Sequence, residues 1–269
     1  MPRGSDPDAG GTGPHPSRPV DTPAEPRSAA AIAEAAGEQR LILWDVDGTL
    51  VHAGPAAREA FDLAVAAVLQ REVPDHGILM SGKTDPQIAL EVMSALHVAE
   101  DEAREHLPAV LEGLTRELES AAHTIRERGR VHPGVEELLR RLHEHPGVVQ
   151  SLLTGNLAAN AALKVGAFGL EKWIDLEIGA YGSDDRDRTR LVPIAIHKAK
   201  QRYGVQFRSE DVWIIGDTPR DLACARAGGA RCLLVGTGRF SFDELVKEDA
   251  DAVLPNLSDV DRVERLLLG

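Results

Sequence analysis

An apolar run that ends in acidic residues, Leu41 to Val51, constrains the fold more than any other part of the chain. Its first four residues, Leu-Ile-Leu-Trp, are typical of a strand buried on both faces of a parallel sheet. Asp45 and Asp47 follow, and their i, i+2 spacing keeps both side chains on one side of an extended segment. Because a buried, unpaired carboxylate is costly, they are expected where the strand leaves the core, either paired or bound to a metal. Gly48 then permits a sharp turn.

Strands and helices alternate in the second half of the chain, after residue 130. This order predicts an α/β fold with a doubly wound, Rossmann-like parallel sheet. The strands expected after the first one are residues 148–153, 174–178, 212–215, 231–235 and 252–254. In such sheets ligands bind beyond the carboxyl ends of the strands.

Between the first strand and residue 130 the sequence predicts helices and no strand. Residues 55–72 are amphipathic, Asp85-Pro86 supplies the N-cap and first turn of a second helix, and residues 99–128 give one or two more. This stretch is too long for a simple crossover, so we interpret it as an all-helical cap domain. The amino-terminal stretch, rich in Pro, Gly and Ser, is expected to be disordered. The predicted division is a disordered tail at 1–37, a core at 38–53 and 130–269, and a cap at 54–129.

Composition narrows the range of partners and compartments. The chain has 269 residues and a formal net charge of −13, which argues against nucleic acid and anionic membranes as partners. No stretch approaches the roughly 20 apolar residues of a membrane span. The first residues contain no apolar signal-peptide core, so we expect a cytoplasmic protein. In that compartment Cys224 and Cys232 are expected to be free, buried thiols.

Polar side chains follow three of the predicted strands, and their convergence is the main functional signal. They are Asp45 and Asp47, then Thr154, Gly155 and Asn156, and finally Asp217 and Asp221. Carboxylates crowded at one edge of the sheet would repel one another unless a cation lay among them, and Mg²⁺ fits best because it prefers oxygen ligands. Mg²⁺ would also neutralise a phosphoryl group and orient it for in-line attack. One of the first two aspartates could then act as a nucleophile and the other as general acid and base.

Three segments resemble the first, second and fourth motifs of the haloacid dehalogenase-like hydrolases. They are Asp45-Val46-Asp47-Gly48-Thr49, Leu153-Thr154-Gly155-Asn156 and Gly216-Asp217-Thr218-Pro219-Arg220-Asp221. The similarity covers about residues 40 to 257. It is greatest to the phosphoglycolate phosphatase-like branch, whose helical cap also follows the first motif.

This resemblance implies a role for each motif residue. Asp45 would be the nucleophile that forms an aspartyl-phosphate, and Asp47 would protonate the leaving oxygen and later activate water. Dehalogenating members generally lack the second aspartate, so Asp47 favours phosphate chemistry. The phosphoryl group would bind at Thr154, Gly155 and Asn156. Mg²⁺ would be held by the Asp45 carboxylate, the Asp47 backbone carbonyl and Asp217, with Asp221 close behind.

The sequence departs from the family at the third motif, which usually presents a lysine just before a helix that starts near a proline. Residues 182–191 contain no lysine. An arginine could face the nucleophile and the phosphate instead, so we expect Arg188 in this role, with Arg190 next and Lys198 as a surface charge two turns into the helix. The alternative is that residues 186–190 form a solvated charged loop.

One segment matches the sequence pattern of a nucleotide-binding motif but lacks the strand and helix that the motif requires. Residues 77–84 match the P-loop pattern G-x-x-x-x-G-K-[ST]. No strand is expected before them, and Pro86 disfavours helical geometry at Asp85, where the P-loop helix should already have begun. We therefore interpret the segment as a cap loop, in which Lys83 or Thr84 faces the substrate or lies on the surface.

The sequence thus predicts a Mg²⁺-dependent phosphatase of a small phosphorylated metabolite, with phosphoglycolate or a sugar phosphate as the suggested kind of substrate. Cap closure would exclude water and supply substrate contacts. A phosphomutase of the same fold, and a catalytically weak binding or regulatory protein, are the alternatives. The sequence leaves open a monomer or a homodimer.

Overall fold

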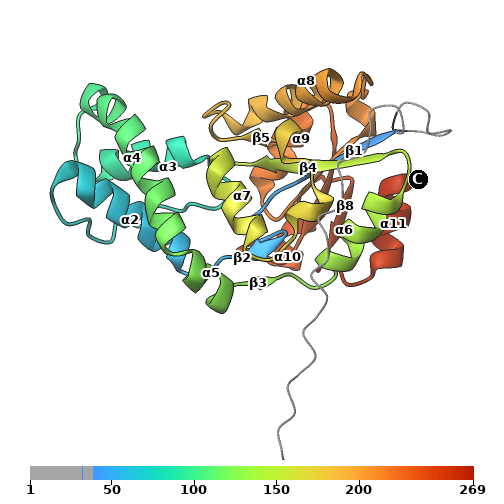
Figure 1. The fold of residues 1–269 in the computed structure, drawn as a ribbon, viewed down its shortest axis with the longest axis horizontal. Helices are drawn as coiled ribbons and strands as arrows, with labels where there is room; N and C mark the ends of the chain where they lie inside the picture. The colour runs from blue at the N-terminus through green and yellow to red at the C-terminus, as the bar shows by residue number, and fades with distance from the viewer. Residues whose placement is uncertain (1–31, 33–38) are drawn as a thin grey trace, which may run out of the picture.

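The computed structural model describes residue 32 and residues 39–269. An α/β core and a helical part that projects from one side of it are visible in Figure 1. The predicted disordered tail, residues 1–37, lies outside the described residues except for Ile32, whose side chain is buried.

A six-stranded parallel sheet forms the centre of the core, in the order β5-β4-β1-β6-β7-β8. Its strands are β1 Arg40–Trp44, β4 Val148–Thr154, β5 Ala180–Tyr181, β6 Val212–Gly216, β7 Arg231–Val235 and β8 Ala252–Leu254. Strand β1 is central and pairs in parallel with both β4 and β6. The loops that follow these three strands therefore start next to one another, at one edge of the sheet.

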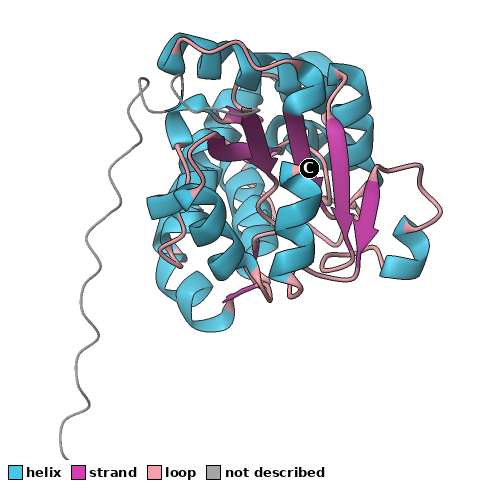
Figure 2. Cartoon of the chain, turned by 90° about the vertical axis from the view of Figure 1, so that its right-hand side faces the viewer, coloured by secondary structure: helices cyan, strands magenta, loops and turns pink. Residues whose placement is uncertain are grey.

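Helices cover both faces of this sheet, as Figure 2 shows. The core helices are α6 Val135–Glu144, α7 Ala158–Gly166, α8 Leu191–Tyr203, α9 Pro219–Gly228, α10 Phe242–Leu245 and α11 Val260–Leu268. Side chains of β1 alternate between the faces, because successive residues of a strand point to opposite sides. Ile42 and Trp44 pack in the cluster that contains α6 and α11, whereas Leu41 and Leu43 pack in the cluster that contains α8 and α9. The doubly wound α/β fold expected from the sequence is confirmed.

The helical part between β1 and α6 has an apolar core of its own. Its helices are α2 Ala56–Leu69, α3 Asp85–Ala95, α4 Glu100–Ser120 and α5 Ala122–Arg128. Buried apolar side chains from α2, α3 and α4, among them Phe61, Val92 and Leu114, form a separate cluster. At its base, β2 Val51–His52 pairs antiparallel with β3 Arg130–Val131. We call residues 54–129 the cap.

One predicted strand is wrong. Residues 174–178 do not form a strand: the chain makes short 3₁₀ helices, η1 Glu171–Trp173 and η2 Leu176–Ile178, before the edge strand β5. The reason is local, because the Asp175 carboxylate accepts a hydrogen bond from the Glu177 N–H at 3.0 Å and turns the backbone. Two further 3₁₀ turns, η3 Arg188–Arg190 and η4 Ser209–Asp211, precede α8 and β6.

The expectations about thiols and membranes can also be compared with the structure. Cys224 and Cys232 are both free and buried, as predicted. Among the described residues, no helix combines the length and the apolar character that crossing a bilayer requires.

Candidate active site

Asp45 lies where the central strand ends, between the ends of its two neighbours. Its backbone N–H still donates to the Ile215 carbonyl at 2.9 Å, so the start of the loop is held by the sheet. The chain then turns at Gly48, whose φ of +89° is in the left-handed region that favours glycine. A Cβ atom at Gly48 would lie 2.5 Å from the Asp217 Oδ2 atom. The turn therefore brings the loops after β1 and β6 into close contact.

Three buried carboxylates meet at this point. Asp45, Asp217 and Asp221 each offer an oxygen, and these oxygens lie within 4.8 Å of one another. Burial raises the pKa of Asp45 to about 6, and the pKa of Asp217 is also raised, first by burial and then by the charge of Asp45. The cluster thus holds negative charge at a free-energy cost that a bound cation would offset.

The donor set fits a hard divalent cation such as Mg²⁺. Asp45 and Asp217 offer carboxylate oxygens, and a Cβ atom at Gly238 would lie 1.7 Å from the Asp217 Oδ2 atom, so only a glycine leaves that carboxylate its place. Asp221 is already engaged, because its Oδ2 atom accepts from the N–H and the hydroxyl of Thr218. Asp45 and Asp217 are therefore the side chains that would hold the ion, with Asp221 behind them.

Arg188 supplies a buried positive charge against these carboxylates. Its Nη2 atom lies 3.2 Å from the Asp45 Oδ1 atom and also forms an ion pair with Asp221, and the residue is only 7% exposed. Burial opposes the charge, but Asp221 and Asp45 hold the pKa of Arg188 above its ordinary value, so the guanidinium stays charged. Among the described residues its Nε atom is buried without a hydrogen-bond partner.

The other basic candidates for the third motif point elsewhere. Arg190 is an exposed residue that pairs with Asp185 and Asp187. Lys198 donates to the Gly179 carbonyl at 2.7 Å and pairs with Asp184 at 2.8 Å. The structure thus places Arg188, and neither of these two, beside Asp45.

The loop after β4 forms the opposite wall of the site. The Asn156 amide donates to the Thr154 hydroxyl at 2.9 Å and to the Asp47 Oδ2 atom at 2.8 Å. Gly155 lies under the cap, since a Cβ atom there would be 2.0 Å from the Lys83 carbonyl oxygen. The Thr154 hydroxyl and the backbone groups of this loop can therefore serve a phosphoryl oxygen next to Asp45. The Asn156 amide, which the sequence analysis also assigned to the phosphoryl group, is instead bound to Thr154 and Asp47.

Lys164 is a site residue that the sequence analysis missed. It lies on α7, is 3% exposed, and its Nζ atom donates to the Asp47 Oδ2 atom at 2.6 Å and to the Asn156 Oδ1 atom at 2.7 Å. The signal was present in the helical pattern: with Ala161 and Val165, Lys164 occupies the buried face of its helix. A lysine on a buried face requires a polar partner, and here the partner is Asp47.

A cavity of about 240 Å³ lies between the cap and the loops that follow β1 and β4. From the core it is lined by Asp45, Asp47, Thr154, Gly155, Asn156, Lys164 and Arg188, whereas Asp217 and Asp221 lie outside its lining. From the cap it is lined by basic and apolar side chains and by one carboxylate: Arg58, Phe61, Met80, Lys83, Asp85 and Ile88. The size suits a small ligand, and both Lys164 and Arg188 give it local positive charge in a chain that is negative overall.

The P-loop-like segment has no P-loop structure. The described residues directly before it, 70–76, form no strand, Lys83 pairs with Glu91, and the Thr84 hydroxyl accepts from the Gln87 N–H at 3.3 Å. Thr84 is therefore the N-cap of α3, and the prediction that Asp85 is the N-cap is wrong. The Asp85 carboxylate turns the other way and binds the core, accepting from the Leu157 N–H at 2.8 Å.

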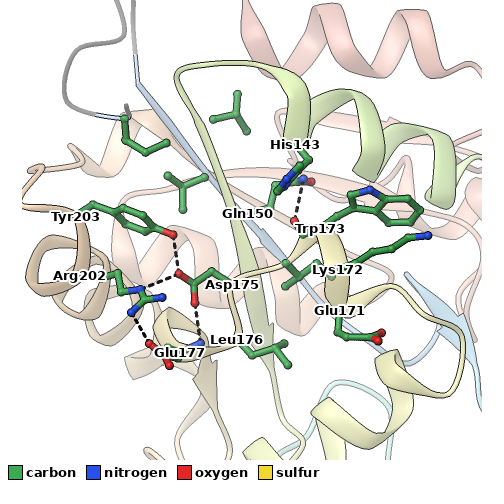
Figure 3. Close-up of a pocket in the computed structure, with 14 residues that line it drawn as sticks. His143, Gln150, Glu171, Lys172, Trp173, Asp175, Leu176, Glu177, Arg202 and Tyr203 are labelled. Atoms are coloured by element: carbon green, nitrogen blue, oxygen red, sulfur yellow. Dashed lines mark hydrogen bonds and ion pairs between the residues drawn. The ribbon is translucent and has the colours of Figure 1, made fainter. Parts of the chain in front are cut away.

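A second pocket of about 290 Å³ lies on another part of the core (Figure 3). Its central carboxylate, Asp175, accepts from the Tyr203 hydroxyl at 2.6 Å and from the Arg202 Nε atom at 3.1 Å. These polar groups satisfy one another, and none of the residues at the carboxyl end of β1 or β6 lines this pocket. The carboxylate cluster under the cap therefore remains the candidate active site.

Comparisons with known proteins agree with this geometry. The family model of the haloacid dehalogenase-like hydrolases matches residues 39–229. A phosphoglycolate phosphatase of Photorhabdus laumondii is 25% identical over 227 residues, which cover 82% of this chain and 90% of that protein. A phosphoglycolate phosphatase of Yersinia pestis is 27% identical over 224 residues, covering 82% and 91%.

Solved structures share the fold. A hydrolase from Pseudomonas syringae aligns with a TM-score of 0.64 at 18% identity, covering 86% of this chain and 100% of that one. CbbY from Rhodobacter sphaeroides, solved in complex with phosphate, aligns with a TM-score of 0.60 at 18% identity, covering 83% and 96%. With most of the chain matched by the family model, the chain belongs to the haloacid dehalogenase-like hydrolases, among the phosphatases of their phosphoglycolate phosphatase-like branch.

Proposed function

We propose that the chain is a Mg²⁺-dependent phosphatase that hydrolyses a small phosphate monoester through an aspartyl-phosphate on Asp45. The observation that carries this proposal is the buried Asp45 carboxylate itself. It belongs to a group of acidic oxygens suited to Mg²⁺, it contacts the Arg188 guanidinium, and it lines a cavity of about 240 Å³ under the cap. When bound, Mg²⁺ would offset the charge of the phosphoryl oxygens and orient them.

The proposed reaction has two displacements at phosphorus. In the first, an Asp45 oxygen attacks, the bond to the ester oxygen breaks, and Asp47 gives its proton to the departing alcohol. In the second, Asp47 takes a proton from water as that water attacks phosphorus, which releases inorganic phosphate and frees Asp45. Asp47 suits this exchange because its side chain is 40% exposed, so it can reach both leaving group and water. Arg188 and the Thr154 hydroxyl are the groups proposed to hold the phosphoryl oxygens.

A small substrate such as phosphoglycolate or a sugar phosphate is supported by three facts. The cavity is small, the cap contributes Arg58 and Lys83 to its lining, and curated relatives are phosphoglycolate phosphatases. A crystal structure of a CbbY mutant from Rhodobacter sphaeroides contains xylulose 1,5-bisphosphate. An anionic or hydroxylated leaving group would lie against the cap residues, which would then decide which ester is accepted.

A phosphate-release screen over a panel of monoesters, with and without Mg²⁺, tests the proposal. The panel includes phosphoglycolate, several sugar phosphates and p-nitrophenyl phosphate. We expect turnover of at least one ester that is lost with a chelator and restored by Mg²⁺. Asp45→Asn is the matched control, since it keeps the shape of the side chain and removes the nucleophilic oxygen pair. Full turnover by Asp45→Asn, or in the presence of chelator, would contradict the proposal.

A further inference from the structure

Helix α7 carries two buried polar side chains one turn apart, Asn160 and Lys164. At i, i+4 spacing they lie on the same face of the helix. Their exposed fractions are 0% and 3%. Figure 1 shows α7 on the side of the core next to the cap. Polar groups buried this completely are expected to be hydrogen-bonded, so their partners indicate what the helix face does.

Asn160 is bound by the cap. Its Nδ2 atom donates to the Asp85 Oδ2 atom at 3.2 Å, and its Oδ1 atom accepts from the Thr115 hydroxyl at 2.9 Å. Asp85 begins α3 and Thr115 lies in α4, so both partners belong to the cap. Among the described residues, these are the side-chain hydrogen bonds that Asn160 makes. The amide therefore has both of these partners only when the cap lies against α7.

Asp85 fixes the start of α7 as well. The same Oδ2 atom accepts from the Leu157 N–H at 2.8 Å, where a negative charge also interacts favourably with the positive end of the helix. The Asp85 N–H donates in turn to the Gly155 carbonyl at 2.7 Å. One cap residue thus binds the phosphoryl-binding loop and the helix that follows it.

Lys164 carries the connection from this helix to the proposed acid and base. Its ammonium binds the carboxylate of Asp47 and the amide oxygen of Asn156, at 2.6 and 2.7 Å. It also interacts electrostatically with Asp85. On this helix face, therefore, Asn160 contacts the cap, and Lys164, one turn later, contacts Asp47.

We propose that α7 couples cap closure to the placement of Asp47, with Asp85, Asn160 and Lys164 as positioning residues. The inference rests on the proposed function, since it is for proton transfer that Asp47 must be held. With the cap docked, Asp85 and Asn160 fix α7, and Lys164 holds the Asp47 carboxylate toward the cavity. With the cap away, α7 loses these contacts and Asp47 loses its fixed position.

Steady-state kinetics on p-nitrophenyl phosphate with Mg²⁺ test the coupling. Displacement of a reacting group by about 1 Å can lower a rate by roughly 100-fold. We therefore expect Asp85→Ala and Lys164→Met each to lower kcat by at least about tenfold, with KM changed by less than about threefold. Asp85→Asn keeps an oxygen that accepts from Leu157 and Asn160, so its kcat should fall clearly less than that of Asp85→Ala. Asp101→Ala, an exposed cap carboxylate on α4, is the control and should match wild type.

The double variant Asp85→Ala/Lys164→Met separates coupling from independent damage. If both residues act through α7, the kcat of the double variant should be no more than about threefold below that of the less active single variant. If the two losses multiply, or if Asp85→Asn is as impaired as Asp85→Ala, the coupling is wrong.

Hydrogen exchange distinguishes failure of this inference from failure of the proposed function. If the wild-type chain hydrolyses no monoester, the proposed function is wrong, but exchange still reports on α7. We expect Asp85→Ala to speed amide exchange in residues 155–166 by at least about tenfold, while Asp101→Ala leaves it unchanged. Unchanged exchange in Asp85→Ala, with the thermal unfolding midpoint recorded to show that the variant is folded, would overturn the coupling.

Discussion

At the scale of single residues, the site is a balance between buried charges of opposite sign. Asp45 faces Arg188, which also pairs with Asp221, and the partly exposed Asp47 faces Lys164, so each of the two aspartates proposed for the chemistry contacts a buried cation. The two cations differ in how far the sequence indicates them. Arg188 could be predicted because the third motif lacks its usual lysine and an arginine stands nearby. Lys164 lies outside any motif, and its role depends on its contact with Asp47, which is far away in the sequence.

The position of Arg188 leads to a prediction about the third motif. Arg188→Ala should lower kcat/KM by roughly 100-fold or more, because it removes the cation beside Asp45 and the phosphoryl group. Lys198→Ala should stay near wild type, because Lys198 pairs with Asp184 instead. The measurement is kcat/KM for the best ester of the screen, with circular dichroism to verify folding. A larger loss in Lys198→Ala than in Arg188→Ala would show that this assignment is reversed.

At the scale of elements, runs of mostly apolar residues predicted the strands of the central sheet except the edge strand β5. Residues 231–235 and 252–254 form β7 and β8 with the predicted bounds. The segment 174–178 failed because one side-chain hydrogen bond, from the Glu177 N–H to Asp175, outweighed its apolar character. The pairing of β2 with β3 was not predicted either, since each has only two residues and their pairing depends on where the cap returns to the core.

The loop after β4 yields a prediction about how the cap docks. A Cβ atom at Gly155 would lie 2.0 Å from the Lys83 carbonyl oxygen, whereas one at Gly166 would meet nothing closer than 4.0 Å. Gly155→Ala should therefore push the cap loop from the core and lower kcat/KM by roughly 100-fold. Gly166→Ala, at the end of α7, should leave kcat/KM unchanged and raise stability by up to about 1 kcal/mol.

Kinetics and urea unfolding of both glycine variants check this prediction. The contrast between them matters more than either value, because both substitutions add one methyl group within twelve residues of each other. Equal activity in the two variants would mean that the close approach of the cap loop to Gly155 is not needed for turnover.

At the scale of the whole molecule, buried carboxylates at the active site lower the free energy of unfolding at neutral pH. The pKa of Asp45 and that of Asp85 are each raised from 3.8 to about 6, in both cases chiefly by burial. A folded-state pKa above the unfolded one means that the folded chain binds the proton more tightly. The contribution to stability is therefore full below pH 3.8 and is lost as the pH rises through about 6. For Asp85 the full loss is roughly 3 kcal/mol.

This sign leads to a prediction that links pH to metal binding. Without Mg²⁺, Asp85→Asn should be more stable than wild type at pH 7.5, since it keeps the hydrogen-bond acceptor and removes the charge. The same substitution should raise the stability less at pH 4.5.

Mg²⁺ should stabilise the wild type at pH 7.5 by about 2.7 kcal/mol at one hundred times its Kd, which corresponds to a rise in Tm of roughly 5–10 °C. Asp217→Asn should reduce that rise and leave the Asp85→Asn effect intact, because Asp217 belongs to the acidic cluster and Asp85 to the cap interface. Thermal and urea unfolding at both pH values, with chelator and with Mg²⁺, separate the effect of the Asp85 charge from the effect of the ion. A Tm that does not respond to Mg²⁺, in a chain whose turnover requires it, would place the ion outside this cluster.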